Sequence, residues 1–270
     1  LKDYYDGYHF SRRNMTDIYN PFSLINALSS QELRSYWASS GATSMLNKFV
    51  KDVELRLSNF DDCLVLRNTL ETSDVTGGGP ELFLYQCGYL TIKGTERNIY
   101  RLGFPNEEVK QALYETVLPA LTMRAEGDIQ SIQAQLYLAL DTCQLPDAMK
   151  SLKALIADVP YSNKKLASMD MEERYRLIIS SILNAIGFRT EVEHKLSTGR
   201  IDILCITPHY TYVIELKLSK NGGVAAAEKQ IKDNQYLEPF KADKTRQVVG
   251  LAIELEDLGK GLLEWKRVEE

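Results

Sequence analysis

Two apolar runs, residues 199–206 and 212–218, constrain the fold of this chain more than any other feature of its sequence. Each run has the length of a buried strand, and the turn composition of residues 207–210 between them predicts a β-hairpin. Asp202, Glu215 and Lys217 lie inside these runs. A charged side chain within a buried strand is costly unless it is paired or binds a metal. These three residues therefore need an explanation, and function is the first candidate.

The predicted hairpin brings two carboxylates together. If the loop has those four residues, Ile206 faces Thr211, and counting back along both strands places Asp202 opposite Glu215. The two-residue period of a strand puts Glu215 and Lys217 on one face. Like charges that oppose each other directly destabilise a hairpin, whereas a divalent cation between them reverses that effect. The sequence therefore predicts a metal site here.

The pattern around this hairpin predicts an α/β core with the order α-β-β-β-α-β and one more strand. Helices are expected at residues 171–186 and 224–238, and strands at 189–195, 200–206, 211–219, 246–254 and 262–268. A strand, a helix of this length and another strand form a crossover unit, so part of the sheet should be parallel. We expect a mixed sheet flanked by helices.

The first part of the chain is predicted to be mainly helical. Helices are expected around residues 24–28 and 45–57 and after a cap at Asn106, with extended segments after Gly88 and at 101–104. Three glycines at 77–79 are not followed by Gly-Lys-Ser/Thr, so they are interpreted as a loop without a nucleotide site. The predicted organisation is a lid-like region at 1–104, a helical connector at 105–165 and the α/β core at 166–270.

Composition limits the partners and the location. The net charge is −5, and the acidic excess lies in residues 1–160, because residues 161–270 carry equal numbers of acidic and basic side chains. Contact with nucleic acid must therefore be local to a site or depend on a metal or a partner. No apolar run approaches the ~18 residues of a membrane span, and residues 1–10 do not form a signal peptide, which predicts a cytoplasmic protein. The chain begins within what looks like folded sequence, which leaves open that it is a fragment.

Glu-x-Lys alone is a weak signal. It occurs four times, at residues 108–110, 193–195, 215–217 and 264–266. Only the occurrence at 215–217 lies within an apolar run and follows an Asp at the pairing position. Glu172 adds a third acid, because it lies in phase with the apolar stripe of the helix expected at 171–186. This combination favours a functional site over a surface salt bridge.

These residues resemble those of a known family. Glu172, then Gly199-Arg200-Ile201-Asp202, then Glu215-Leu216-Lys217 and Gln230, are similar to the motifs of the PD-(D/E)xK nuclease superfamily, and more narrowly to the nuclease domain at the C-terminus of bacterial AAA-ATPase-like proteins. The earlier motifs Tyr5-Asp6-Gly7-Tyr8, Tyr19-Asn20-Pro21-Phe22-Ser23, Tyr36-Trp37 and Pro105-Asn106-Glu107-Glu108-Val109 resemble the C-terminal part of the ATPase-like region. The family's leading Pro is replaced by Ile201. The nucleotide-binding lobe that the resemblance would place before residue 1 is not part of this sequence, so ATP binding is not assigned to this chain.

The resemblance implies a restriction-endonuclease-like core that hydrolyses phosphodiester bonds, with DNA as the expected substrate. Asp202, Glu215 and the backbone carbonyl of Leu216 would hold Mg²⁺ or Mn²⁺, and Glu172 would complete or water-bridge that shell. Lys217 would position or help deprotonate a water molecule and neutralise developing negative charge. Gln230 could orient Lys217, contact the nucleic-acid backbone or only contribute packing.

Two other functions stay open. The core could be a catalytically inactive nuclease-like module that binds nucleic acid or protein. Alternatively, the chain could be a structural or oligomerising ATPase-associated protein in which Asp202, Glu215 and Lys217 form a buried salt-bridge set. The resemblance also implies an ATP-binding lobe upstream in the full-length protein, whereas no membrane partner is expected and homo-oligomerisation stays undecided.

Overall fold

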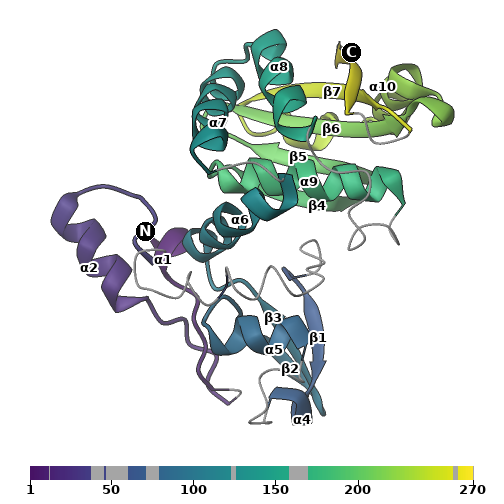
Figure 1. Cartoon of the computed structure of the whole chain (residues 1–270). Helices are drawn as coiled ribbons and strands as arrows, with labels where there is room; N and C mark the ends of the chain where they lie inside the picture. The colour runs from purple at the N-terminus through teal and green to yellow at the C-terminus, as the bar shows by residue number, and fades with distance from the viewer. Residues whose placement is uncertain are drawn as a thin grey trace. The chain divides into compact units, whose positions relative to one another are not determined.

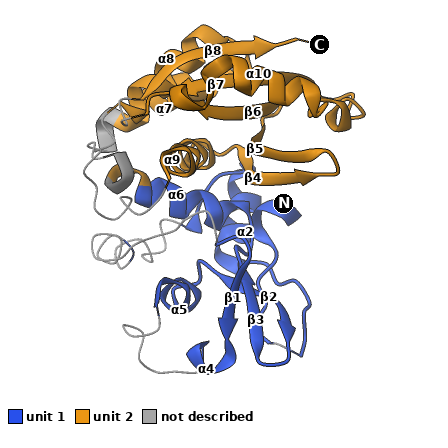
Figure 2. Cartoon of the chain, turned by 90° about the vertical axis from the view of Figure 1, so that its right-hand side faces the viewer, with its two compact units in different colours: residues 1–117 blue, residues 118–270 orange. Residues whose placement is uncertain are grey.

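The computed structural model describes residues 1–11, 13–37, 46, 60–70, 79–122, 126–157, 170–257 and 261–269. The chain forms two compact units, Leu1–Val117 and Leu118–Glu270 (Figure 2). The division lies within helix α6, Glu107–Thr122. The segment predicted as a helical connector is therefore shared between the two units.

A five-stranded mixed sheet forms the centre of the second unit (Figure 1). Its strands, in spatial order, are β4 (Arg189–Leu196), β5 (Gly199–Ile206), β6 (Tyr210–Leu218), β7 (Gln247–Leu255) and β8 (Leu262–Val268). Strands β6 and β7 are parallel and the other neighbours are antiparallel. Helix α10, Gly223–Asp233, connects the parallel pair, as the crossover unit requires. The mixed α/β core predicted from the sequence is confirmed.

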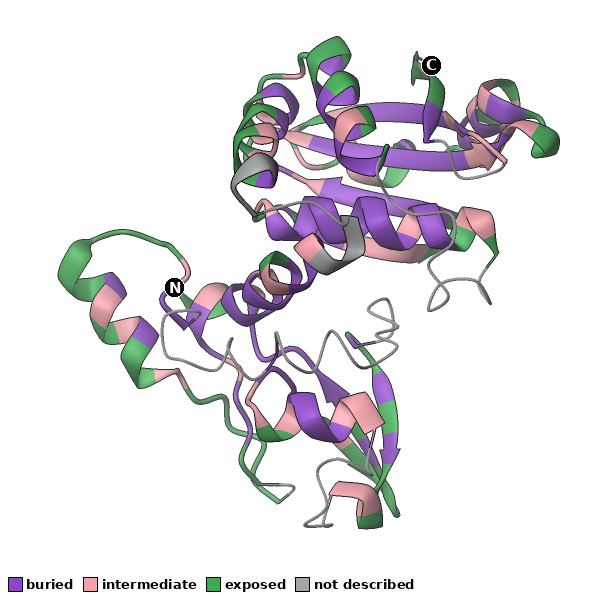
Figure 3. Ribbon diagram, viewed as in Figure 1, coloured by how far each residue is buried: buried purple, intermediate pink, exposed green. Residues whose placement is uncertain are grey.

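Helices cover both faces of this sheet. Ala227 and Ile231 of α10 pack in one apolar cluster with Val213 of β6. Tyr212 points to the opposite face, where its hydroxyl donates a hydrogen bond to the Leu140 carbonyl of α7, Glu126–Asp141. Strands β5, β6 and β7 are accordingly buried along most of their length (Figure 3).

Two further helices complete this unit. Helix α8, Leu145–Ile156, packs against α7, and helix α9, Met171–Ala185, packs against β4, β5 and β6. The side chain of Asp170 caps α9 by accepting a hydrogen bond from the Glu172 amide. Capping fixes the first turn of α9, from which Glu172 projects.

The helix predicted at 224–238 ends earlier, at Asp233. Gln235 adopts a left-handed backbone with φ of 52°, and the Tyr236 amide donates to the Ile231 carbonyl at 3.1 Å. This backbone pattern closes a helix. Pro239 lies in a separate short 3₁₀ turn, Glu238–Phe240, and is not the residue that stops α10.

Tyr236 explains why the chain turns there. Its buried hydroxyl donates to the Arg200 carbonyl and accepts from the Arg200 amide, each at 3.0 Å, and it also accepts from Asn234 at 3.0 Å. A Cβ atom at Gly199 would lie only 2.5 Å from the same hydroxyl. Tyr236 therefore anchors the end of α10 on the start of β5.

Replacing Tyr236 with Phe should lower the free energy of unfolding by about 1–3 kcal/mol, because both Arg200 backbone groups lose the partly buried hydroxyl that pairs with them. Urea unfolding followed by circular dichroism measures this change. Tyr210→Phe serves as the control, since Tyr210 is only half-buried. Equal unfolding midpoints in the two variants would contradict the anchoring role.

The first unit combines short helices with a small sheet. Its elements are α1 (Lys2–Tyr5), α2 (Pro21–Ser30), β1 (Cys63–Leu66), α4 (Arg67–Leu70), α5 (Gly79–Gln86), β2 (Thr91–Glu96), β3 (Ile99–Gly103) and most of α6. The strands pair antiparallel in the order β1-β3-β2. The sequence predicted the extended segments at β2 and β3 but not their union with β1, because four apolar residues do not define a period.

Two predictions for this unit concern residues that the structure largely does not describe. Apart from Leu46, the helix expected at 45–57 lies outside the described residues, as do the glycines at 77 and 78, and Gly79 begins α5. Among the described helices, none combines the length and the apolar character that a membrane crossing demands.

The motifs of the first unit meet around the start of α6. The buried carboxylate of Glu108 accepts the amides of Tyr36 at 2.7 Å and Trp37 at 2.9 Å. A Cβ atom at Gly7 would collide with the Pro105 carbonyl, and the φ of 104° at Gly7 also favours glycine. Three motifs that are distant in sequence thus pack as one structure.

Candidate active site

The hydrogen-bond ladder between β5 and β6 stops where the two carboxylates begin. The strands keep the predicted register, and the last ladder pair is Ile203 with Ile214. One position further, Asp202 lies opposite Glu215 in that register. There the Asp202 carboxylate accepts the Leu216 amide at 3.0 Å through Oδ2. A side chain thus replaces a ladder bond and fixes the carboxylate at the end of the paired region.

Strand β4 is interrupted at the same level. Val192 pairs with Ile203 and His194 pairs with Ile201, whereas Glu193 between them has a left-handed backbone with φ of 54°. A non-glycine residue in this conformation costs on the order of 1 kcal/mol and such residues cluster at functional sites. Both strands that flank β5 therefore depart from regular pairing beside Asp202.

Arg176 of α9 is the closest cation to Asp202. Its Nη1 lies 2.8 Å from Asp202 Oδ1, and its Nη2 lies 3.1 Å from Glu193 Oε1. Arg176 follows Glu172 by four residues and so projects from the same side of the helix. Reasoning from the sequence missed it, although that spacing from Glu172 was a usable signal.

Glu215 is the most deeply buried acid of the group. Its side chain is 1% exposed, Oε1 accepts a hydrogen bond from Lys217 Nζ at 3.0 Å, and no donor group among the described residues reaches Oε2. Glu215 also shares a side-chain hydrogen bond with Asp202. Burial, followed by the negative charge of Asp202, raises the pKa of Glu215 to about 8, although Lys217 opposes this change. Burial and Asp202 therefore favour the neutral, protonated carboxyl of Glu215.

Lys217 lies between two acids. Besides Glu215, its Nζ contacts Glu172 Oε1 at 3.6 Å, and Glu172 Oε2 accepts a hydrogen bond from Asn221 at 3.3 Å. Burial lowers the pKa of Lys217, but the charges of Glu215, Asp202 and Glu172 outweigh burial, so the pKa is raised. Lys217 is an ammonium at neutral pH.

The oxygen atoms in this group suit a hard cation. Asp202 and Glu215 supply two carboxylates, and no described donor group reaches Oε2 of Glu215, so this oxygen is open to a cation. In a strand, the N–H and the C=O of one residue point toward the same neighbouring strand. The Leu216 N–H donates to Asp202 of β5, so the Leu216 carbonyl also points toward β5. No described group of three or more His, Cys, Asp or Glu side chains is arranged for a metal. Mg²⁺ needs only one or two carboxylates, since it keeps several waters, so these residues fit it.

Gln230 is placed differently from the other candidates. It lies on α10, and its Nε2 donates to the Tyr236 hydroxyl at 3.4 Å. The structure therefore brings Glu172, Asp202, Glu215 and Lys217 into one connected group, whereas the hydrogen bond of Gln230 supports the anchor at the end of α10.

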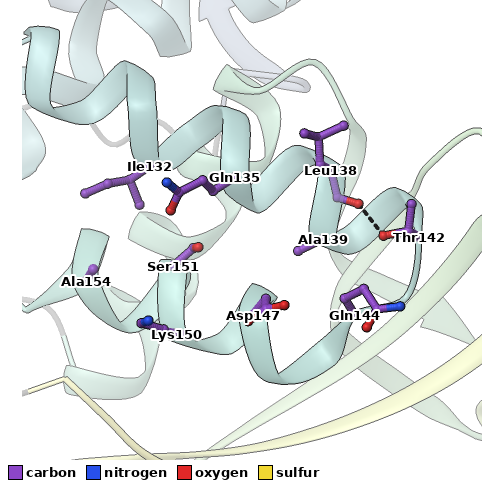
Figure 4. Close-up of a pocket in the computed structure, with 10 residues that line it drawn as sticks. All are labelled: Ile132, Gln135, Leu138, Ala139, Thr142, Gln144, Asp147, Lys150, Ser151 and Ala154. Carbon is purple, nitrogen blue, oxygen red and sulfur yellow. Dashed lines mark hydrogen bonds between the residues drawn. The ribbon is translucent and has the colours of Figure 1, made fainter.

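One groove of the described surface lies apart from the candidate acids. A groove of about 450 Å³ runs between α7 and α8, and its charged lining residues are Asp147 and Lys150 (Figure 4). None of the candidate acids lines it.

Comparison with known proteins agrees with this location. Residues 170–260 match the model of the PD-(D/E)XK nuclease superfamily, a segment that includes every candidate residue. The "uncharacterized protein in vnfD 5'region" of Azotobacter chroococcum mcd 1 is 28% identical over 255 residues, which are 90% of this chain and 47% of that protein. The chain thus spans about half the length of this relative. No solved structure matches the chain.

Proposed function

We propose that the second unit is a metal-dependent nuclease domain that hydrolyses phosphodiester bonds in DNA. The observation that carries this proposal is the Glu215 carboxyl, which is almost fully buried and shares a side-chain hydrogen bond with a second acid, Asp202. Burying one acid against another costs free energy, which a structural salt bridge does not explain and a bound divalent cation would offset. The superfamily match of residues 170–260 supports a nuclease on independent grounds.

In this proposal Asp202, Glu215 and the Leu216 carbonyl hold Mg²⁺ or Mn²⁺. A bound cation would stabilise charge on the scissile phosphate and lower the pKa of a coordinated water. Glu215 would give up its proton to become a ligand. The hydrogen bond from the Leu216 amide keeps the Asp202 carboxylate in place throughout.

Lys217 is assigned to the water and the phosphate. Its ammonium is held between Glu215, to which it donates a hydrogen bond, and Glu172, with which it forms an ion pair. Such a fixed positive charge offsets the negative charge that develops on the phosphate without reorganisation at the moment of reaction. Glu172 acts through Lys217, and Asn221 orients Glu172.

A second candidate function has one observation in its favour. Each carboxylate already has a cation from the chain, Arg176 for Asp202 and Lys217 for Glu215. This arrangement suits a nuclease-like module that binds nucleic acid without cleaving it. It predicts affinity for duplex DNA and no strand breakage with any divalent metal.

The first unit is proposed as the lid-like, C-terminal part of an AAA-ATPase-like region. Support comes from the motifs that carry this resemblance, because Gly7 packs on Pro105 and Glu108 accepts the amides of Tyr36 and Trp37. An ATP-binding lobe in the longer protein would then be the partner that regulates the nuclease domain.

Nicking of supercoiled plasmid in Mg²⁺, Mn²⁺, Ca²⁺ or EDTA tests the proposal. Wild-type protein should nick DNA with Mg²⁺ or Mn²⁺ and not with EDTA, and Asp202→Asn should reduce the rate at least about 100-fold. Glu264→Gln is the matched control, because Glu264 begins an exposed Glu-x-Lys on β8. Binding without nicking would establish the second candidate, and equal nicking by Asp202→Asn would refute the assigned site.

A further inference from the structure

Arg176 occupies the position where a cation would meet Asp202. Its guanidinium is 2.8 Å from Asp202 Oδ1, and the other carboxylate oxygen, Oδ2, is taken by the Leu216 amide. Both side chains are largely buried, at 12% exposed for Arg176 and 9% for Asp202. Each Asp202 oxygen therefore already accepts one hydrogen bond, and a divalent cation at Oδ1 would meet the positive charge of the guanidinium beside it.

The carboxylate of Glu193 can hold Arg176 after its contact with Asp202 is lost. Glu193 Oε1 lies 3.1 Å from Arg176 Nη2 and 3.2 Å from Nη1 of Arg200. The left-handed backbone of Glu193 occurs at the strand position beside Asp202. The two ion pairs of Arg176 use different terminal nitrogens, so it can lose the Asp202 contact without losing Glu193.

We propose that Arg176 is a displaceable counterion and a positioning residue of the metal site. In the metal-free protein it holds Asp202 in place. When a divalent cation takes Oδ1, Arg176 stays on Glu193 and turns the released N–H toward a phosphate oxygen of the substrate. The planar guanidinium suits this exchange, because it matches carboxylate and phosphate equally well. The phosphate contact rests on the proposed nuclease function, whereas the competition with metal does not.

A purely structural Arg176 makes the opposite prediction for metal binding. If it only ties α9 to the sheet, its removal would loosen Asp202 and weaken the binding of a cation. If it competes with the cation, its removal eliminates a positive charge next to Oδ1 and strengthens binding.

Titration calorimetry with Mn²⁺ alone on the full chain separates these two roles. Arg176→Met should bind Mn²⁺ about 10-fold more tightly than wild type. Arg176→Lys keeps the charge and should stay within about 3-fold of wild type. Arg200→Met is the matched control, because Arg200 is 55% exposed and pairs with Glu193 but not with Asp202. The affinity of this variant for Mn²⁺ should differ less than about 2-fold from that of wild type. Unchanged or weaker binding by Arg176→Met, or tighter binding by Arg176→Lys, would overturn the proposal.

Glu193→Gln tests the same proposal should Arg176→Met fail to fold. Loss of the shared carboxylate leaves Arg176 with Asp202 alone, so Mn²⁺ affinity should fall about 3-fold to 10-fold. An unchanged affinity would refute the competition. The phosphate contact has its own readout: Arg176→Met should raise the KM for duplex DNA while Mn²⁺ binds more tightly, and an unchanged KM would exclude it. If wild-type protein binds Mn²⁺ but does not cleave DNA, the nuclease proposal fails while the Mn²⁺ measurements still decide the role of Arg176.

Discussion

Replacing Lys217 with Met is expected to reduce metal-dependent cleavage of DNA roughly 1000-fold while Mn²⁺ still binds. The aliphatic part of the side chain is kept, so packing around the half-buried stem changes little. The ammonium that Glu215 and Glu172 hold in place is lost. Single-turnover cleavage of a labelled duplex at saturating metal measures the rate, and calorimetry measures Mn²⁺ affinity.

The control for this prediction is Lys266→Met. Lys266 ends another Glu-x-Lys, lies on the edge strand β8 and pairs with Glu228 at 2.6 Å on the surface. Its replacement should leave the cleavage rate within about 2-fold of wild type, because exposed pairs contribute little. A loss of cleavage in Lys217→Met that merely follows a loss of Mn²⁺ binding would mean that Lys217 supports the metal site and not the chemical step.

The part of the site within the hairpin could be predicted because short-range rules determine it. The turn at 207–210 sets the register, and the two-residue period then places Asp202 opposite Glu215. The ladder ends at Ile203, so the close approach of the carboxylates depends on the Leu216 amide, which no pattern in the sequence indicated. Local rules thus gave the register, and tertiary contacts gave the geometry.

Contacts between distant elements could not be predicted in this way. Arg176 reaches Asp202 because α9 packs against β4 and β5 at a particular rotation, which one sequence does not specify. The positive φ of Glu193 is equally hidden, since nothing in its residue type requires it. Gln230 shows the opposite limit: its motif left open whether it orients Lys217, contacts nucleic acid or only packs, and in the structure its amide donates to the Tyr236 hydroxyl.

Glu215 should make the metal-free protein less stable as the pH rises from about 5 to 8. Its pKa is near 8 in the folded state and about 4.5 in the unfolded chain, so the folded protein holds one more proton over this range. The stability from the protonated form is complete below about pH 4.5 and is lost as the pH rises through 8. Lys217 adds nothing to this slope, because its pKa is raised in the folded state, and the pH range over which it affects stability therefore lies above about pH 10.

Glu215→Gln should remove that slope and abolish tight Mn²⁺ binding. In EDTA between pH 5 and 8, the free energy of unfolding of wild type should fall by up to about 1.4 kcal/mol per pH unit because of Glu215. The amide of Glu215→Gln stays neutral, so this contribution to the slope should be absent from the variant. Glu228→Gln is the control, because hydrogen bonds from Lys266 and Lys232 lower the pKa of Glu228 and keep its window below this range. Added Mn²⁺ should raise the melting temperature of wild type and not of Glu215→Gln, because a ligand stabilises only the state that binds it. Equal slopes in EDTA would show that Glu215 is already ionised in the folded protein, and equal stabilisation by Mn²⁺ would place the cation away from Glu215.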